Sequence, residues 1–355
     1  MGRLEKEYVS QVLDSNYLNE GDVTARFEQK LADFLGVRHC VAVTSGTAAL
    51  TLALMALGIG HGDEVIVPDF TFIATANAVR LAGADVKLVD IEPARFTVDA
   101  EKVLQAISRR TKAILAVDVN GRGASYEDLE TIAAQKGLYL LCDAAEALGS
   151  RYRDRYLGTF GDAGCFSFSA NKTITTGQGG LIATANTEVY HRLLELKDQG
   201  RRTRGRGGDD LHPVMGYNFK FTNLQAAVGL AQFEKLRERL DHARQREERY
   251  IQRLGDQPRW GLPSRNNREG EVTQWTDLLA DDRKSIEAAF RQAGIGYRCF
   301  WHPLHRQGPY AADDADFATS IETSQKGLWL PSSFSLTEEQ VDKTAEVLRR
   351  LPGHA

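Results

Sequence analysis

The sequence predicts an α/β protein with one large, mainly parallel seven-stranded sheet and a smaller C-terminal α+β domain. Between about residues 39 and 235, short β-rich runs alternate with amphipathic helical stretches, which is typical of parallel strands joined by helical crossovers. A chain of 355 residues also exceeds the usual size of one hydrophobic core. We therefore expect a large domain at residues 1–250, beginning with a helical segment, and a small domain at residues 251–355.

Seven short apolar runs carry the strand pattern of the large domain. In open sheets of this kind, ligands collect at the carboxyl ends of the strands. Ser45, Asp143 and Ser167 lie at or near such ends, so we expect their side chains to converge. The predicted strands are His39–Val43, Glu64–Val67, Asp85–Val89, Ala113–Val117, Leu138–Cys142, Gly164–Phe168 and Gly180–Ala183.

Helix signals follow the last of these strands. The segment Thr222-Asn223-Leu224-Gln225 has the pattern of a capping box, which predicts a helix that begins near Thr222. Apolar residues then follow one face, and the pattern continues as a charged helix through Tyr250. One long helix is therefore expected here.

The remainder of the chain has the pattern of a second domain. Residues 255–271 are rich in Gly, Pro, Asn and Arg, which indicates a linker. The segment after it reads as a strand, a helix over Asp282–Ala293, a second strand, a polar loop and a closing helix from Thr337. No internal repeat or low-complexity tract interrupts it.

Composition excludes several classes of function. A net charge of −4 offers no basic face for nucleic acid, and no apolar stretch reaches the roughly 18 residues of a membrane span. With a charged amino-terminal segment as well, we expect a cytoplasmic protein that binds neither nucleic acid nor membrane. Four cysteines without metal-ligand spacing are expected to be free thiols, and no metal is expected: Cys40, Cys142, Cys165 and Cys299.

Lys172 is the residue that points most directly to chemistry. Its neighbours are small and polar, and the glycine-rich turn at residues 177–180 follows it, so its side chain is directed into a crowded site where it can form an imine. Asp143 comes 29 residues earlier, after an apolar run, where a carboxylate can keep a pyridine nitrogen protonated. Considered one at a time, Lys172 would ordinarily be interpreted as a solvated surface lysine, and Asp143 as a helix cap or a salt-bridge partner.

A phosphate site is predicted where the first strand meets the following helix. Ser45, Gly46 and Thr47 begin that helix, whose free N–H groups and dipole favour an anion, while Gly46 permits close approach. Ser167, five residues before Lys172, is expected to reach the same phosphate. A capped helix and a strand serine bonded to backbone are the alternatives.

Phe72 and Glu146 complete the predicted site. Phe72 follows a strand and is placed to stack on a ring, although aromatic residues there are more often core. Glu146 lies in a run of small residues after Asp143 and is expected at the ring's edge. A phosphate cup, a ring carboxylate and an imine-forming lysine are what pyridoxal phosphate requires, so we predict this cofactor.

These segments together resemble the DegT/DnrJ/EryC1/StrS family of sugar aminotransferases, nearly from end to end. The resemblance implies the type I pyridoxal phosphate aminotransferase fold, with Lys172 as the cofactor lysine, Asp143 at the ring nitrogen, Phe72 stacked on the ring, and Thr47 and Ser167 at the phosphate. The motifs that carry it are Ser45–Leu50, Gly62–Val65, Asp143–Gly149, Phe166–Phe168, Lys172, Gly216–Asn218 and Trp301–His305.

The resemblance also implies partners. It predicts a homodimer whose active site is shared between subunits, with Asn218 of one protomer at the phosphate bound by the other. It further implies transfer of an amino group from L-glutamate to a keto carbon of a nucleotide-linked sugar. Asn171–Gly177 and the glutamate at position 146 favour the branch that aminates C4 of GDP-4-keto-6-deoxy-mannose. Val119–Ala124 and Gln178 depart from that branch. The alternative is an aminotransferase that acts on another nucleotide-linked or free keto sugar, with a 3-keto or 4-keto group and UDP or dTDP as the nucleotide.

Contacts to the nucleotide and sugar are less evident. Lys220 and His305 are the candidate substrate residues, and His302 is equally compatible with a structural role. A glycine-interleaved arginine cluster fits either a mobile loop near a diphosphate or a solvated loop: Arg201, Arg202, Arg204 and Arg206.

Three other functions fit the sequence less well than transamination. The dehydratase branch of the family carries histidine in place of the lysine, so Lys172 argues against dehydration. A non-enzymatic sensor need not keep Lys172 together with Asp143. The lack of a Gly-x-Gly-x-x-Gly motif after the first strand argues against a nicotinamide oxidoreductase.

Overall fold

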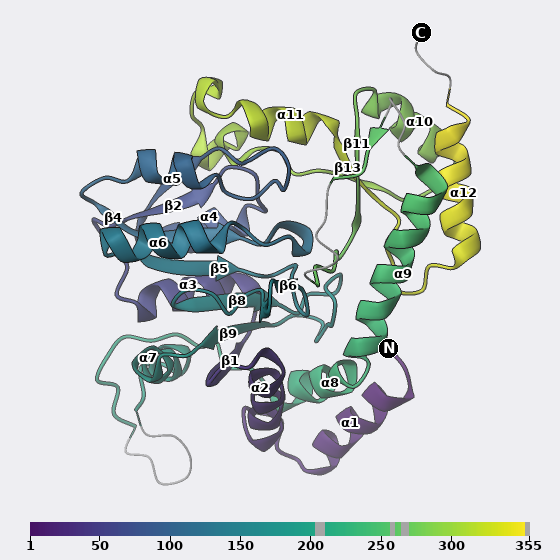
Figure 1. The fold of residues 1–355 in the computed structure, drawn as a ribbon. Helices are drawn as coiled ribbons and strands as arrows, with labels where there is room; N and C mark the ends of the chain where they lie inside the picture. The colour runs from purple at the N-terminus through teal and green to yellow at the C-terminus, as the bar shows by residue number, and fades with distance from the viewer. Residues whose placement is uncertain (203–209, 256–259, 264–269, 352–355) are drawn as a thin grey trace.

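The computed structural model describes residues 1–202, 210–255, 260–263 and 270–351, and a seven-stranded sheet forms its centre (Figure 1). The strand order is β1-β9-β8-β5-β4-β2-β3. Strand β9 is antiparallel to β1 and β8, and the other pairs are parallel. The bounds are β1 His39–Val43, β2 Glu64–Pro68, β3 Asp85–Val89, β4 Thr111–Val117, β5 Tyr139–Asp143, β8 Ala163–Ser167 and β9 Gly180–Thr184.

The predicted seven-stranded, mainly parallel sheet is confirmed. No predicted strand end is displaced by more than two residues. Asp143 and Ser167 are the last residues of the neighbouring strands β5 and β8, and Ser45 follows β1. Because these carboxyl ends meet at one edge of the sheet, the three side chains converge as expected.

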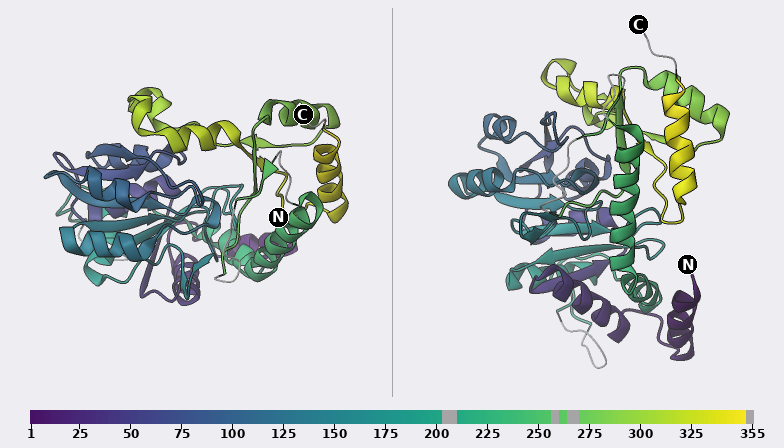
Figure 2. Two further views of the ribbon diagram at one scale, coloured as in Figure 1. Left: turned by 45° about the horizontal axis from the view of Figure 1, so that its top comes forward. Right: turned by 45° about the vertical axis from the view of Figure 1, so that its right-hand side comes forward.

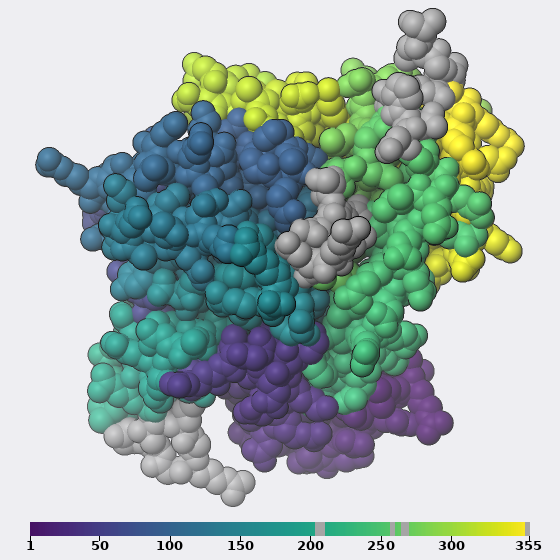
Figure 3. All heavy atoms as spheres, in the orientation of Figure 1, coloured from purple at the N-terminus to yellow at the C-terminus, as the bar shows by residue number. Residues whose placement is uncertain are grey.

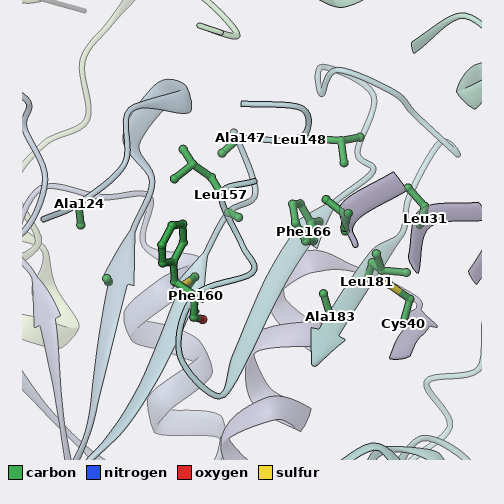
Figure 4. Packing of buried hydrophobic residues seen from close by; sticks show 14 of the residues in the cluster. Leu31, Cys40, Ala124, Ala147, Leu148, Leu157, Phe160, Phe166, Leu181 and Ala183 are labelled. Carbon is green, nitrogen blue, oxygen red and sulfur yellow. Dashed lines mark hydrogen bonds between the residues drawn. The ribbon is translucent and has the colours of Figure 1, made fainter. Parts of the chain in front are cut away.

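Each face of the sheet has its own core, since successive strand side chains point to opposite faces. On one face, Cys40, Phe166, Leu181 and Ala183 pack with Leu31 of α2 (Figure 4). The opposite face packs against α3, α4 and α7. The helices around the sheet are α2 Asp22–Leu35, α3 Gly46–Ala56, α4 Ala74–Leu81, α5 Ala100–Ala106, α6 Tyr126–Lys136 and α7 Thr187–Lys197.

The region after Thr222 contains two helices where one long helix was predicted. Thr222 caps α8 as expected, with its hydroxyl accepting a hydrogen bond from the Gln225 N–H at 3.2 Å. The prediction of one helix through Tyr250 is wrong, because Lys235 (φ −102°, ψ 5°) separates α8 from α9. Helix α8 packs between α1 and α2, whereas α9 extends towards the second sheet (Figure 1). The bounds are α1 Arg3–Asp14, α8 Asn223–Phe233 and α9 Leu236–Leu254.

A second, four-stranded sheet of order β10-β11-β13-β12 lies beside the first (Figure 2). In the space-filling view, the green and yellow C-terminal part of the chain covers the right-hand side of the molecule next to the blue and teal part (Figure 3). The predicted strands, the helix over Asp282–Ala293 and the helix from Thr337 are present. The expected polar loop also contains α11 and β13, neither of which the sequence predicted, and β13 has only four residues. The bounds are β10 Trp260–Gly261, β11 Thr276–Ala280, β12 Arg298–Cys299, β13 Gly327–Leu330, α10 Arg283–Ala293, α11 Ala318–Lys326, α12 Glu338–Arg349, and the separate hairpin β6 Arg151–Tyr152 and β7 Arg155–Tyr156.

Helix α9 crosses the predicted domain boundary at residues 250 and 251. Its Leu240 belongs to the core of the large sheet, and its Leu254 to the core of the second sheet. The same helix therefore stabilises both halves, and the boundary stays a prediction.

Within the described ranges, no helix combines the length and the apolar character that a bilayer crossing requires. The four cysteines are free, and burial raises the pKa of the Cys40, Cys142 and Cys165 thiols well above the usual value.

Candidate active site

A cavity of about 320 Å³ lies at the carboxyl ends of the large-sheet strands. Its wall includes Trp275, Arg298 and Trp301, which come from the second sheet and the segments next to it. The cavity therefore lies between the two sheets. Of the nine residues predicted to bind the cofactor, eight line it: Ser45, Gly46, Thr47, Phe72, Asp143, Glu146, Ser167 and Lys172.

The start of α3 forms one end of the cavity. Ser45 is the N-cap of this helix, and its hydroxyl accepts a hydrogen bond from the Ala48 N–H at 3.1 Å. The first N–H groups of a helix have no intrahelical acceptor and favour an anion. A Cβ on Gly46 would lie 3.0 Å from the Ser167 Cβ, so glycine allows the helix and β8 to approach closely. With the hydroxyls of Thr47 and Ser167 nearby, this end suits a phosphate.

Asp143 supplies a buried carboxylate in the middle of the cavity wall. One oxygen accepts from the Thr75 hydroxyl at 2.7 Å and the other from the Ala145 N–H at 3.2 Å. Burial raises the pKa of Asp143, and these hydrogen bonds oppose the rise. A positively charged N–H donor, such as a protonated ring nitrogen, would stabilise the ionised form of this buried carboxylate. The sequence did not indicate Thr75, since its bond to Asp143 depends on α4 packing across the strand end.

Lys172 lies opposite the carboxylate of Glu146. Its Nζ donates to Glu146 Oε1 at 3.2 Å and lies 5.3 Å from the centroid of the Trp275 ring. The lysine side chain is only 13% exposed, so its amine is largely shielded from solvent within reach of the cavity. The other Glu146 oxygen accepts from the Asn120 N–H at 3.1 Å.

The segment containing Asn120 ties this wall to the second sheet. Asn120 has φ 52° and ψ 36°, a left-handed conformation that Asn tolerates better than most residues. Its side-chain oxygen accepts from the Trp275 N–H at 2.8 Å, and its amide donates to the Trp275 carbonyl at 2.8 Å. The same amide donates to Asp277, which also pairs with the fully buried Arg122. Sequence reasoning marked Val119–Ala124 only as a departure and missed this role.

Asp118 is a second buried carboxyl in the cavity wall. It accepts a hydrogen bond from the Tyr126 hydroxyl, and its other oxygen has no partner among the described residues. Burial raises the pKa of Asp118 to about 8, and the neighbouring Asp143 charge adds to the rise. Near neutral pH, Asp118 is therefore largely protonated.

Three predicted residues lie outside the cavity. Asn218 is exposed and forms a backbone bridge with Asp198, and Lys220 pairs with the Asp198 carboxylate at 2.5 Å. His305 is fully buried, with Nδ1 2.7 Å from Asp69 and Nε2 3.0 Å from Asp314.

The structure describes His305 fully, but only part of the arginine cluster. Both ring nitrogens of His305 face carboxylates and His305 does not line the cavity, so its role as a substrate contact stays a prediction. In the arginine cluster, Arg202 pairs with Glu195, while Arg204 and Arg206 lie outside the described residues.

Comparison with known proteins agrees with this geometry. The model of the DegT/DnrJ/EryC1/StrS aminotransferase family matches residues 1–349. The chain is 38% identical over 355 residues to the GDP-perosamine synthase of Caulobacter vibrioides, covering 97% of this chain and 94% of the relative. It is 35% identical over 344 residues to the GDP-perosamine synthase of Escherichia coli O157:H7, covering 95% and 92%.

The fold agrees equally well with a solved structure. S. venezuelae DesV superposes with a TM-score of 0.93 at 30% identity, covering 97% of this chain and 93% of that one. Both the family match and the relatives extend over nearly the whole chain. The chain therefore belongs to the DegT/DnrJ/EryC1/StrS aminotransferase family, has the type I pyridoxal phosphate fold, and is a pyridoxal phosphate-dependent sugar aminotransferase.

Proposed function

We propose that this enzyme transfers the amino group of L-glutamate to C4 of GDP-4-keto-6-deoxy-mannose. The similarity to two GDP-perosamine synthases over more than nine-tenths of the chain supports this substrate. The observation that carries the catalytic part is that Lys172 and Asp143 line one cavity together with the start of α3. The product would be a deoxyamino sugar for polysaccharide biosynthesis.

The residues of the cavity fit pyridoxal phosphate by their chemistry. Ser45, Gly46, Thr47 and Ser167 would hold the phosphate, since they offer free N–H groups and hydroxyls. Asp143 would pair with the ring nitrogen, and Phe72, which is 51% exposed yet lines the cavity, would cover the ring face. When bound, pyridoxal phosphate supplies an aldehyde that captures amines and a ring that takes up electrons.

The protein's own groups would then bind and move protons. Lys172 would be the base that removes and returns the proton at the carbon carrying the amino group, because its side chain lines the cavity together with Asp143 and Phe72. Glu146 would orient the Lys172 amine, and Asn120 would hold Glu146.

We further propose a homodimer in which Asn218 completes the phosphate site of the partner. Asn218 is exposed and does not line the cavity of its own subunit. Large apolar side chains just before it are also exposed, with Val214 at 39% and Met215 at 77%, which suits a subunit interface. Light scattering of the purified protein tests this, with a monomeric mass as the contrary result.

The test of function is direct. Purified holoenzyme supplied with L-glutamate and GDP-4-keto-6-deoxy-mannose should yield 2-oxoglutarate and a 4-amino sugar nucleotide, and Lys172→Ala should abolish both. Turnover by Lys172→Ala would refute the role of this lysine. A panel of 3-keto and 4-keto sugars linked to GDP, UDP or dTDP tests the alternative substrates, and product mass distinguishes amination from loss of water.

A further inference from the structure

Asp69, the residue just after β2, joins the large sheet to the segment that follows β12. Its side chain is fully buried. One carboxylate oxygen accepts a hydrogen bond from the His305 backbone N–H at 2.7 Å, and the other lies 2.7 Å from His305 Nδ1. The Asp69 carbonyl accepts from the Leu304 N–H at 2.9 Å. Three hydrogen bonds therefore connect two segments that are 236 residues apart in the sequence.

The His305 ring is held in one orientation. It is fully buried, stacks on Phe317 with ring centroids 4.4 Å apart, and has its Nε2 3.0 Å from Asp314 Oδ1. Because a carboxylate offers only acceptors, the Nδ1 that faces Asp69 carries a proton. Burial raises the pKa of Asp69, and the hydrogen bonds from His305 oppose that rise. His305 therefore stabilises the ionised form of Asp69.

Both joined segments lead into the cavity that Lys172 lines. Phe72 comes three residues after Asp69, Trp301 comes four residues before His305, and both aromatic residues line that cavity. The contact between Asp69 and His305 therefore affects how the two cavity-lining segments lie against each other.

The Phe72 ring depends on its backbone for its position. Phe72 is 51% exposed, so its ring is covered by few neighbouring side chains. On the side of α4, the Phe72 carbonyl accepts from the Thr75 N–H and from the Thr75 hydroxyl, both at 3.1 Å. On the side of β2, the bonds between Asp69 and His305 hold the chain. Loss of the second set of bonds should let the Phe72 ring move.

We propose that His305 and Asp69 are positioning residues for the cofactor. The Nδ1–H of His305 fixes Asp69, and Asp69 fixes the backbone that holds Phe72 over the ring. The inference rests on the proposed function, in which Phe72 covers the pyridoxal phosphate ring. It adds the pair of residues that keeps Phe72 in place, and it gives His305 a role that requires no contact with the substrate.

The experiment compares two replacements of His305 in the full-length protein. In His305→Asn, the amide nitrogen takes the place of Nδ1 and can still donate to Asp69. In His305→Gln, the amide nitrogen takes the place of Nε2, so the side-chain bond to Asp69 is lost and the bond to Asp314 is kept.

Two measurements follow the cofactor in these variants. Titration of pyridoxal phosphate into the cofactor-free protein gives the Kd, and circular dichroism of the bound cofactor's absorbance band reports how the ring is held. We expect His305→Gln to raise the Kd by about fivefold or more and to reduce the dichroism, because a hydrogen bond to a charged group is lost. His305→Asn should stay within about twofold of the wild type.

A double variant tests whether His305 acts through Phe72. Phe72→Ala should raise the Kd for pyridoxal phosphate by about fivefold or more, since it removes an aromatic ring from the cofactor's face. Adding His305→Gln to Phe72→Ala should then change the Kd by less than about twofold, because the effects of coupled residues do not add.

Tyr310→Phe is the matched control. Tyr310 belongs to the same segment as His305, and its hydroxyl donates to Asn77 Oδ1 of α4 at 2.7 Å. Neither Tyr310 nor Asn77 lines the cavity. The variant also loses one hydrogen bond between this segment and the large domain, yet its Kd should match that of the wild type. Melting temperatures of all variants separate a loss of stability from a change in the position of Phe72.

Three results would overturn the inference. The first is a wild-type Kd in His305→Gln, and the second is a Kd in His305→Asn that is raised by about fivefold or more, which decides the matter even where His305→Gln does not fold. The third is full additivity in the double variant, which would show that His305 acts elsewhere.

The same measurements separate this inference from the proposed function. A wild-type Kd in Phe72→Ala defeats the proposed ring cover and the inference together. A wild type that aminates no GDP-linked sugar defeats only the proposed substrate, because cofactor binding is measured without any sugar.

Discussion

Lys172 Nζ and Glu146 Oε1 lie 3.2 Å apart, so the lysine predicted to bear the chemistry is held by the Glu146 carboxylate. That carboxylate is fixed in turn by the Asn120 N–H, and Asn120 is bonded to both backbone groups of Trp275. The position of the amine therefore depends on the contact between the two sheets as well as on the strand that carries it.

Glu146→Gln tests this arrangement. Glutamine keeps the shape and an acceptor for the Asn120 N–H but loses the charge that orients the Lys172 ammonium. A hydrogen bond to a charged group contributes about 1.5 kcal/mol or more. If that much stabilisation of the transition state is lost, kcat should fall by about tenfold or more. Cofactor absorbance should stay, because the phosphate end is unchanged. A kcat equal to that of the wild type would show that Glu146 does not orient the lysine.

Gly46→Ala tests the phosphate end. The added Cβ would meet the Ser167 Cβ at 3.0 Å, so α3 and β8 must separate slightly. We expect the Kd for pyridoxal phosphate to rise by about tenfold, since the N–H groups lose their alignment with an anion. Gly308→Ala is the control, because a Cβ there meets nothing within 4 Å. Equal cofactor affinity in both variants would place the phosphate elsewhere.

The sequence predicted the large sheet and most of the cavity because both depend on local patterns. Ser45, Asp143 and Ser167 could be found since strand ends in a parallel sheet meet at one edge. Trp275 and Asn120 could not, because their contact joins residues 155 positions apart and depends on how the second sheet packs. The break at Lys235 was not predicted because the helical sequence pattern continues through it, although its backbone leaves the helical conformation.

The buried Asp118 predicts a pH-dependent stability. Its pKa is raised to about 8 in the folded protein against an ordinary value of 3.8, so between these pH values the folded state binds a proton that the unfolded state has released. This group therefore lowers the free energy of unfolding as pH rises from about 4 to about 8, by at most about 1.4 kcal/mol per pH unit.

Asp118→Asn should remove that contribution. Asparagine can still accept from the Tyr126 hydroxyl through its amide oxygen, although its amide places two N–H donors where protonated Asp118 has one O–H. Urea denaturation of the cofactor-free protein at pH 5 and pH 8 should show a smaller decline for the variant, which should be the more stable of the two at pH 8. Parallel pH dependence in variant and wild type would mean that Asp118 is ionised throughout.

The fully buried pair of Arg122 and Asp277 gives the last prediction. Replacing Arg122 by methionine leaves the Asp277 carboxylate buried without a countercharge, which should lower the free energy of unfolding by about 3–5 kcal/mol. Asp277 also accepts from the Asn120 amide at 2.9 Å, and an asparagine at position 277 can keep that bond. Adding Asp277→Asn to Arg122→Met should therefore recover most of the loss, because no uncompensated charge remains. Denaturant unfolding of the wild type, both single variants and the double variant measures the coupling between the two residues. If the losses simply add in the double variant, the pair does not compensate charge, and the link from the second sheet to Asn120 and the lysine must be held by the Trp275 backbone alone.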